Sequence, residues 1–241
     1  MNRSAAVLIV LASVVAVQRL AGAPASAAAS ASDHVAIERF LAGLEKPPVP
    51  YQARRRMEAS SAKLNESAWM EAVTQFEPQT GFQFSIMAEG GSQRIRNRVL
   101  KKVLEAEQEN FADGDWRQGN LSRANYLFEF GGRAGAGMLR MTLTPRRRDS
   151  RLVSGAAILG ARSGELVRVE GRLDKSPSFW VRWVDVSRSY APIGGAMMPV
   201  AVESTADVRI AGVSTFSMTY DYHMVDGEAI NGNAPRLLVA R

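Results

Sequence analysis

The sequence predicts a mainly β protein (α+β) in which about ten antiparallel strands curl into a barrel or part of one. Apolar and polar residues alternate along most of the chain, as in "FSMTYDY", where Phe216, Met218 and Tyr220 share one parity. Turns that contain glycine, such as Ser163-Gly164, separate these runs. Because strands and helices do not alternate along the chain, a parallel βαβ arrangement is not expected.

The N-terminal residues have the layout of a secretory signal peptide. Arg3 precedes an apolar run, Ala5 to Val17, and small residues with A-x-A spacing follow. This run is too short to span a membrane comfortably. We therefore expect a signal peptide (1–30), a folded domain (33–227) and a C-terminal tail (228–241).

The absence of cysteine and the net positive charge indicate the cellular compartment and the kind of partner. The chain has no Cys, so disulfides and a lipid anchor on an N-terminal cysteine are excluded. We expect a bacterial periplasmic protein that is soluble after cleavage. Its formal charge is +6 and its pI about 10.0. Because an exported protein rarely meets nucleic acid, we expect no nucleic-acid partner, and anionic lipid headgroups suit the basic surface better.

Two helices are predicted. The first begins at Ser32-Asp33 and runs to about Leu44, where "EKPPVP" ends it. The second spans roughly Ser92 to Asn110, with an apolar stripe through Ile95, Val99, Val103 and Ala106. Its early turns carry five cations, Arg94, Arg96, Arg98, Lys101 and Lys102. They form either a solvated face or a contact with acidic lipid or a partner.

The strand candidates fill the remaining chain. They begin at "YQARRRMEAS", where Arg55 shares its parity with Tyr51, Ala53, Met57 and Ala59. The next two runs, "SAWMEAVTQF" and "GFQFSIMAE", complete a meander of three strands with one face inward. The later candidates are "NYLFEF", "MLRMTLTP", Leu152 to Leu159, Leu166 to Leu173, Phe179 to Tyr190, Met197 to Ser204, Ala206 to Ala211 and Ser214 to Tyr222.

The strand over Phe179 to Tyr190 does not alternate cleanly. Phe179, Val181 and Trp183 share one parity, while Trp180, Val184 and Val186 share the other. Either set fits an interior face. A one-residue slip would exchange the two faces, so the sequence leaves the register open.

Catalytic signals are weak. His34 and His223 are the two histidines, and no G-x-S-x-G nucleophile elbow accompanies them. No cluster of metal ligands stands out. We therefore expect no enzyme, no cofactor and no metal. A lipid hydrolase that uses His223 is a disfavoured alternative.

Several runs together resemble a known family. After a signal peptide and an amphipathic helix come "YQARRRMEA", "GFQFSIMAEGGSQRIRNRVL", "NYLFEF", "LTPRRRDSRLVSGAAIL", "GELVRVEGRLDKSPSFWVRWVDVSRSY" and "FSMTYDY". Over about Val35 to Gly227 this order is similar to the outer-membrane lipoprotein-sorting-protein-like family, which includes LolA/LolB carriers and the RseB sensor domain. The resemblance implies an incomplete antiparallel barrel wrapped around helices, with an apolar concave face that holds acyl chains.

From this resemblance, and from the Phe, Met, Tyr and Trp side chains on the predicted inner faces, we expect a periplasmic binder or carrier of a lipid, lipoprotein acyl chain or similar amphiphile. The alternative is an envelope sensor or interaction module that binds a protein partner. Aromatic and methionine side chains suit an adaptable cavity. The expected ligand-binding residues are Phe82, Phe84, Tyr126, Phe128, Phe130, Met141, Val181, Trp183, Phe216, Met218 and Tyr220. The expected headgroup or partner contacts are Arg98, Lys102, Arg146, Arg147 and Arg148.

Overall fold

The structure is a computed structural model that describes residues 29–44, 46–114 and 116–230. Nearly all of the expected signal peptide, and most of the expected tail, lie outside these residues. Within them, no helix has both the length and the apolar character needed to cross a membrane. The first described helix begins at Ala31.

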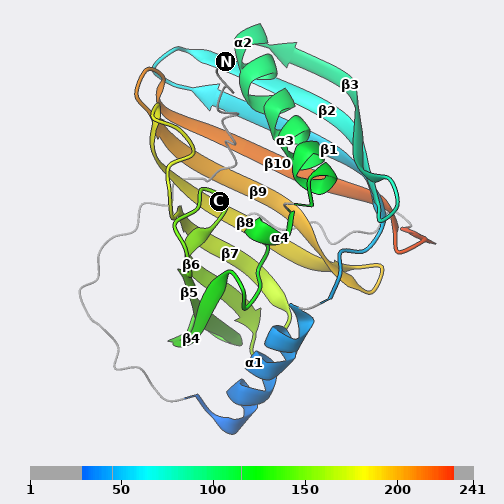
Figure 1. Ribbon diagram of the computed structural model, residues 1–241, viewed down its shortest axis with the longest axis vertical. Coiled ribbons are helices and arrows are strands. Elements are labelled where there is room, and N and C mark those ends of the chain that lie inside the picture. Colours follow the sequence, from blue (N-terminus) through cyan, green and yellow to red (C-terminus); the bar gives the residue numbers. More distant parts are fainter. Residues whose placement is uncertain (1–28, 45, 115, 231–241) are drawn as a thin grey trace.

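One large antiparallel sheet makes up most of the described chain (Figure 1). Its order is β3-β2-β1-β10-β9-β8-β7-β6-β5-β4, and β11 pairs with β10. The strands are β1 (Tyr51–Ser61), β2 (Glu66–Glu77), β3 (Gly81–Gly91), β4 (Tyr126–Arg133), β5 (Met138–Pro145), β6 (Val153–Gly160), β7 (Leu166–Leu173), β8 (Val181–Ile193), β9 (Ala196–Val208), β10 (Gly212–Val225) and β11 (Glu228–Ala229). Because β3 and β4 end this order without pairing, the predicted incomplete barrel is confirmed.

The alternating runs do form strands with one buried face. In β1, Ala53, Arg55, Met57 and Ala59 are buried, and their neighbours are more exposed. One detail of the prediction is wrong, because the two predicted strands lie in the single strand β9, which ends at Val208, and residues 209–211 form the turn that follows. The strand continues because Ser204 pairs with Val186 on one side and with Phe216 on the other, which leaves no room for a turn.

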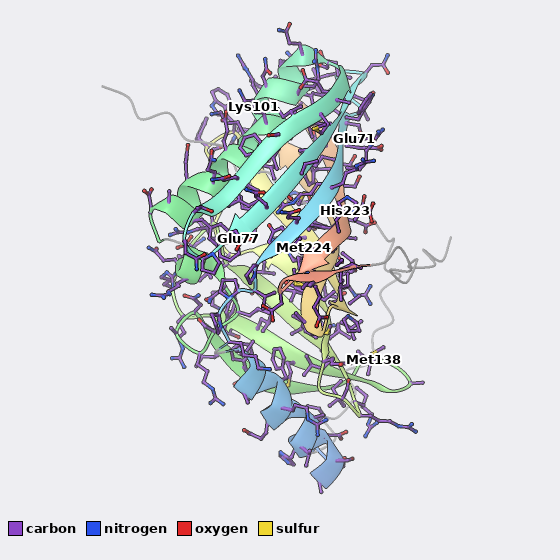
Figure 2. The ribbon with its side chains drawn as sticks, turned by 90° about the vertical axis from the view of Figure 1, so that its right-hand side faces the viewer. Glu71, Glu77, Lys101, Met138, His223 and Met224 are labelled. Carbon is purple, nitrogen blue, oxygen red and sulfur yellow. The ribbon has the colours of Figure 1, made fainter. Side chains whose placement is uncertain are left out.

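An irregular helical segment, residues 93–112, covers one half of the concave face. It consists of α2 (Gln93–Ile95), the π-helical turn η1 (Arg96–Leu100) and α3 (Lys101–Ala112). Ser92 caps it by accepting a hydrogen bond from the Ile95 N–H. Seen from the side, this segment and Lys101 lie on one side of the sheet, with Glu71 and His223 on the other (Figure 2).

The core beneath this helical segment is well filled. Leu100 and Leu104 are fully buried against Met57, Met70 and Met218 of the sheet. Phe111 continues the contact, with its ring 4.6 Å from that of Phe76 and 6.2 Å from that of Phe82. This packing explains why the predicted apolar stripe lies inward.

Helix α1 (Ala31–Gly43) covers the other half, over β4 to β7. Its cap is Ser30, not the predicted Ser32-Asp33, because the Asp33 side chain instead completes a capping box by accepting from the Ser30 N–H. Arg133 of β4 donates to the Asp33 carboxylate at 2.9 Å. At the other end, Arg39 donates to the carbonyls of Arg162 and Ser163.

Candidate functional site

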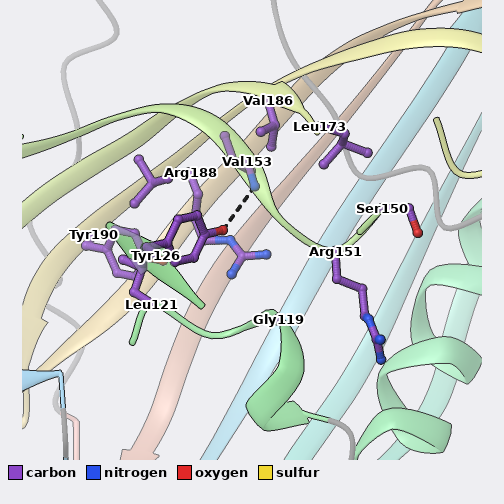
Figure 3. Close-up of a pocket in the computed structure, with 11 residues that line it drawn as sticks. Gly119, Leu121, Tyr126, Ser150, Arg151, Val153, Leu173, Val186, Arg188 and Tyr190 are labelled. Carbon is purple, nitrogen blue, oxygen red and sulfur yellow. Dashed lines mark hydrogen bonds between the residues drawn. The ribbon is translucent and has the colours of Figure 1, made fainter. Parts of the chain in front are cut away.

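A cavity of about 130 Å³ lies along the concave face, at the boundary between the two covered halves (Figure 3). We call it the seam cavity. Strands β6, β7 and β8 supply most of its floor, and the loop before β4 and the residues before β6 supply its rim. Its lining residues are Gly119, Leu121, Tyr126, Ser150, Arg151, Val153, Val169, Leu173, Val186, Arg188 and Tyr190. Five of these residues are aliphatic, and the polar side chains are those of Tyr126, Ser150, Arg151, Arg188 and Tyr190.

The rim loop of the cavity is fixed by an arginine and an asparagine. Asn125 donates from Nδ2 to the carbonyl oxygens of Arg117 and Asn120, both at 2.8 Å. Arg147 donates to the Asn125 side-chain oxygen at 2.6 Å and also to the Gln118 carbonyl. The rim loop therefore consists of the short helix α4 (Trp116–Gly119) and the residues that lead from it to β4, and polar contacts hold it in place.

Tyr126 forms a rigid part of the cavity wall. Its hydroxyl accepts a hydrogen bond from the Val153 N–H at 3.0 Å (Figure 3). Burial raises the pKa of Tyr126, so this hydroxyl stays neutral. Because its acceptor role is already taken up by the backbone, Tyr126 contributes mainly shape and apolar surface.

Arg188 is the charged group of the cavity. It follows Val184 and Val186 at the inward parity of β8, so its side chain lies within the concave interior, where solvent reaches it through the cavity. The neighbouring Tyr190 raises the pKa of Arg188, although burial opposes this, so the guanidinium is charged. Among the described residues, no carboxylate forms an ion pair with it.

The other cavity arginine is already neutralised. The Arg151 guanidinium donates to both carboxylate oxygens of Asp149, at 3.1 and 3.0 Å. These contacts help lower the pKa of Asp149, although burial opposes them. The cavity therefore carries one cationic group with no matching anion, which is Arg188.

A second inward arginine, Arg55, lies further along the concave face. It is 1% exposed and donates to both carboxylate oxygens of Glu107 on α3, at 2.5 and 3.0 Å. It also donates to the Tyr51 hydroxyl at 2.6 Å, and its guanidinium lies 4.7 Å from the centre of the Tyr220 ring. Burial is the largest single influence and opposes its charge, but Glu107, Tyr220 and Tyr51 together raise the pKa of Arg55.

The structure distributes the predicted ligand-binding residues over three environments. Tyr126 is the one of them that lines the seam cavity. Phe82, Val181, Phe216 and Met218 are buried in the core around the helical segment, with Phe84 and Tyr220 packed against it. Met141 is buried in the core beneath α1, where Phe128 and Phe130 pack; the Phe40 and Phe128 ring centres lie 5.9 Å apart. Most of these side chains therefore fill space between sheet and helices.

The prediction that Trp183 faces the interior is wrong. The β8–β9 register shifts between Val181 and Trp183, so Val181, Val184 and Val186 all point into the core. The Trp183 ring lies instead on the outer face, 4.8 Å from the Arg172 guanidinium. A β-bulge at Arg182 explains why this strand does not alternate cleanly.

The predicted cationic contacts are largely engaged within the protein. Lys102 and Lys101 share Glu105, whereas Arg98 is exposed and makes no ion pair within the described chain. Arg146 donates to the carbonyls of Arg123 and Tyr126, and Arg148 donates to that of Asp174. Arg146, Arg147 and Arg148 thus stabilise the rim of the seam cavity rather than lining it.

Five residues that line the seam cavity were not predicted from the sequence: Arg188, Leu121, Val153, Leu173 and Val186. A signal for Arg188 was present, because it shares its parity with Val184 and Val186, as Arg55 does with the apolar residues of β1. A cation at an inward parity marks a charge that needs an internal partner. The aliphatic residues carried no signal that separates a cavity wall from a core.

The two histidines do not assemble a site. His223 is exposed on β10, and its carbonyl accepts from the Ile230 N–H. Across residues 29–44, 46–114 and 116–230, no three His, Asp or Glu side chains gather in a way that would hold a metal ion.

Comparison with known proteins finds similarity in structure alone. No family model and no curated protein matches the chain. One similar solved structure is a LolA superfamily protein from Nitrosomonas europaea, with 9% identity over 80% of this chain and 92% of that chain and a TM-score of 0.38. Another is a DUF1329 family protein from Desulfovibrio piger, with 6% identity, the same coverage and a TM-score of 0.35. At these identities and TM-scores, neither structure assigns a family or a residue role to this chain.

Proposed function

We propose that this protein is a non-catalytic binder or carrier of an amphiphile with an anionic headgroup, acting in the bacterial cell envelope. The observation that carries this proposal is Arg188, an inward cation without a carboxylate partner in the described chain, on the floor of a cavity with aliphatic walls. The periplasmic location rests on the signal-peptide pattern of residues 1–30.

The charge of Arg188 favours an anionic group. The Arg188 side chain lies on the concave face and is exposed to solvent through the cavity, so its positive charge is accessible to a ligand that enters there. A carboxylate or phosphate can accept two parallel hydrogen bonds from an arginine, and such charge-assisted pairs are among the stronger polar contacts in proteins. The neighbouring Tyr190 hydroxyl offers a further polar contact to the same headgroup.

The walls favour an apolar tail next to this headgroup. Leu121, Val153, Val169, Leu173 and Val186 provide aliphatic contact around the arginine. A cavity of about 130 Å³ is similar in size to cavities that hold benzene. It therefore accommodates a headgroup and the first carbons, and a longer chain requires α1 or the rim loop to shift. Buried tail carbons contribute roughly 25 cal/mol per Å² before ordering costs.

The test is native mass spectrometry on protein purified from a periplasmic extract without detergent. Wild-type protein is expected to carry an extra mass that fragments as a fatty acid or anionic lipid. Arg188→Met is expected to lose this mass. The matched control is Arg168→Met, which removes an exposed arginine from the adjacent strand that already has Glu170 as a partner. An unliganded wild type that also fails to bind added fatty acid would contradict the proposal, as would full ligand content in Arg188→Met.

A further inference from the structure

Two large aromatic side chains are exposed at one end of the sheet. Phe179 is 72% exposed and Trp180 is 52% exposed, in the connection between β7 and β8. Their rings contact each other edge to face, with centres 5.5 Å apart. Neither belongs to a core cluster, so the fold itself leaves these aromatic surfaces uncovered.

The turn between β9 and β10 holds this aromatic pair in position. The Arg209 N–H donates to the Trp180 carbonyl and its Nε donates to the Phe179 carbonyl, both at 2.8 Å. The Arg209 guanidinium also lies over the Phe179 ring at 4.6 Å. The pair is thus presented by backbone hydrogen bonds and a cation–π contact rather than by hydrophobic packing.

Further apolar side chains extend the same end of the molecule. Ile210 is 59% exposed and Val213 is 51% exposed, in and just after the same turn. The β1–β2 turn lies beside them, because the Ser61 hydroxyl donates to the Ala211 carbonyl at 2.8 Å. Figure 1 shows these connections together at the upper left. We define the tip as residues 62–65, 174–182 and 207–213.

The tip is also basic. It carries four cationic residues, Lys63, Lys175, Arg182 and Arg209, and two acidic residues, Asp174 and Asp207. Arg182 pairs with Asp207 at 3.0 Å, so the remaining excess is positive. A rim of cations around exposed Trp and Phe matches the chemistry of an anionic bilayer surface, where Trp partitions to the interface and Lys and Arg meet the headgroups.

We propose that the tip is a membrane-docking surface that inserts Phe179 and Trp180 into the interfacial layer of a bilayer rich in anionic lipid. The surface is separate from the seam cavity, so the proposal does not depend on the proposed ligand. A bilayer explains both the apolar pair and the positive rim, whereas a solvated loop explains neither.

The test is co-sedimentation of the mature protein with vesicles of equal parts phosphatidylglycerol and phosphatidylcholine, compared with vesicles of phosphatidylcholine alone. Wild type is expected to bind the anionic vesicles, more weakly as salt increases. The double substitution Phe179→Ser/Trp180→Ser is expected to reduce binding at least tenfold. The matched control Val35→Ser/Met87→Ser removes two equally exposed apolar side chains elsewhere and is expected to bind as wild type.

A second variant keeps the test independent of folding. Lys63→Glu/Lys175→Glu changes only exposed charges and is expected to weaken binding to anionic vesicles severalfold. Arg188→Met is expected to dock as wild type, which separates this proposal from the cavity. A wild type that binds neither vesicle overturns the lipid partner and leaves the tip as a protein contact. Equal vesicle binding by wild type and the serine double variant overturns the role of the aromatic pair.

Discussion

Two arginines on the same concave face differ in whether a carboxylate contacts them directly. Arg55, in the half covered by the helical segment, is 1% exposed and is matched by Glu107 and Tyr51. Arg188, at the boundary between the halves, faces a cavity and has no carboxylate partner within the described residues. The difference separates a charge that stabilises the fold from a charge that is available to a ligand.

The surroundings of each arginine follow from what covers it. Leu100 and Leu104 of the helical segment fill the space beside Arg55, and Glu107 of the same segment supplies the counter-charge. Beside Arg188, Leu121 of the rim loop and the aliphatic residues of β6 to β8 supply no counter-charge. The helical segment therefore supplies a carboxylate that pairs with Arg55, whereas the rim loop supplies none that pairs with Arg188.

The largest expected effect comes from removing the partner of Arg55. Glu107→Gln leaves a buried guanidinium without its counter-charge, and we expect the free energy of unfolding to fall by about 3 kcal/mol. Chemical denaturation measures this change. The control Glu105→Gln removes a pair whose cations, Lys101 and Lys102, are solvent-exposed, and is expected to lower it by about 0.5 kcal/mol. Equal losses in the two variants would remove the distinction between a carboxylate that pairs with the buried Arg55 and one that pairs with exposed lysines.

The same comparison predicts a small effect at the second arginine. Arg188→Met removes a charge that has no internal carboxylate, so we expect the free energy of unfolding of the unliganded protein to change by no more than about 0.5 kcal/mol. Arg55→Met, which leaves Glu107 without its cationic partner, is expected to lower it by about 3 kcal/mol. Denaturant titration of both variants checks this. A large loss in Arg188→Met would show that Arg188 supports the fold.

The smallest expected effect concerns acid and helix α1. The Ser30 backbone N–H and hydroxyl lower the pKa of Asp33 from its ordinary value of 3.8, with a further contribution from Arg133. A carboxyl with a lowered folded-state pKa stabilises the fold fully above its unfolded pKa, and this contribution is lost as the pH falls through the folded-state value. We expect Asp33→Asn to melt lower than wild type at pH 7 and the gap to shrink below about pH 4. An unchanged gap at both pH values would exclude this role.

The sequence predicted those features of the fold that follow from the alternation of apolar and polar residues and from the positions of turns. Alternation in β1 and β10 and the apolar stripe of residues 93–112 identified the inward faces, because burial on one side imposes those periods. The bulge at Arg182 was missed, since one inserted residue leaves no composition signal, and Trp183 was therefore assigned to the wrong face.

The site was less accessible to sequence reasoning. Parity indicates which face Phe82, Phe216 and Met218 occupy, but not whether a helix fills the space opposite them. That depends on contacts between residues far apart in the chain, such as Arg55 with Glu107. The tip was missed for the same reason, because Arg209 meets Phe179 and Trp180 only after β8 and β9 have paired.

The most direct measurement compares two ligands that share a tail and differ in headgroup. Isothermal titration of wild-type protein, stripped of bound lipid, is carried out with dodecanoate and with dodecanol, and repeated with Arg188→Met. We predict that wild type binds dodecanoate at least tenfold more tightly than dodecanol, and that Arg188→Met removes this preference. Equal binding of the two ligands by wild type, or a preference that survives in Arg188→Met, would contradict an anion site at Arg188.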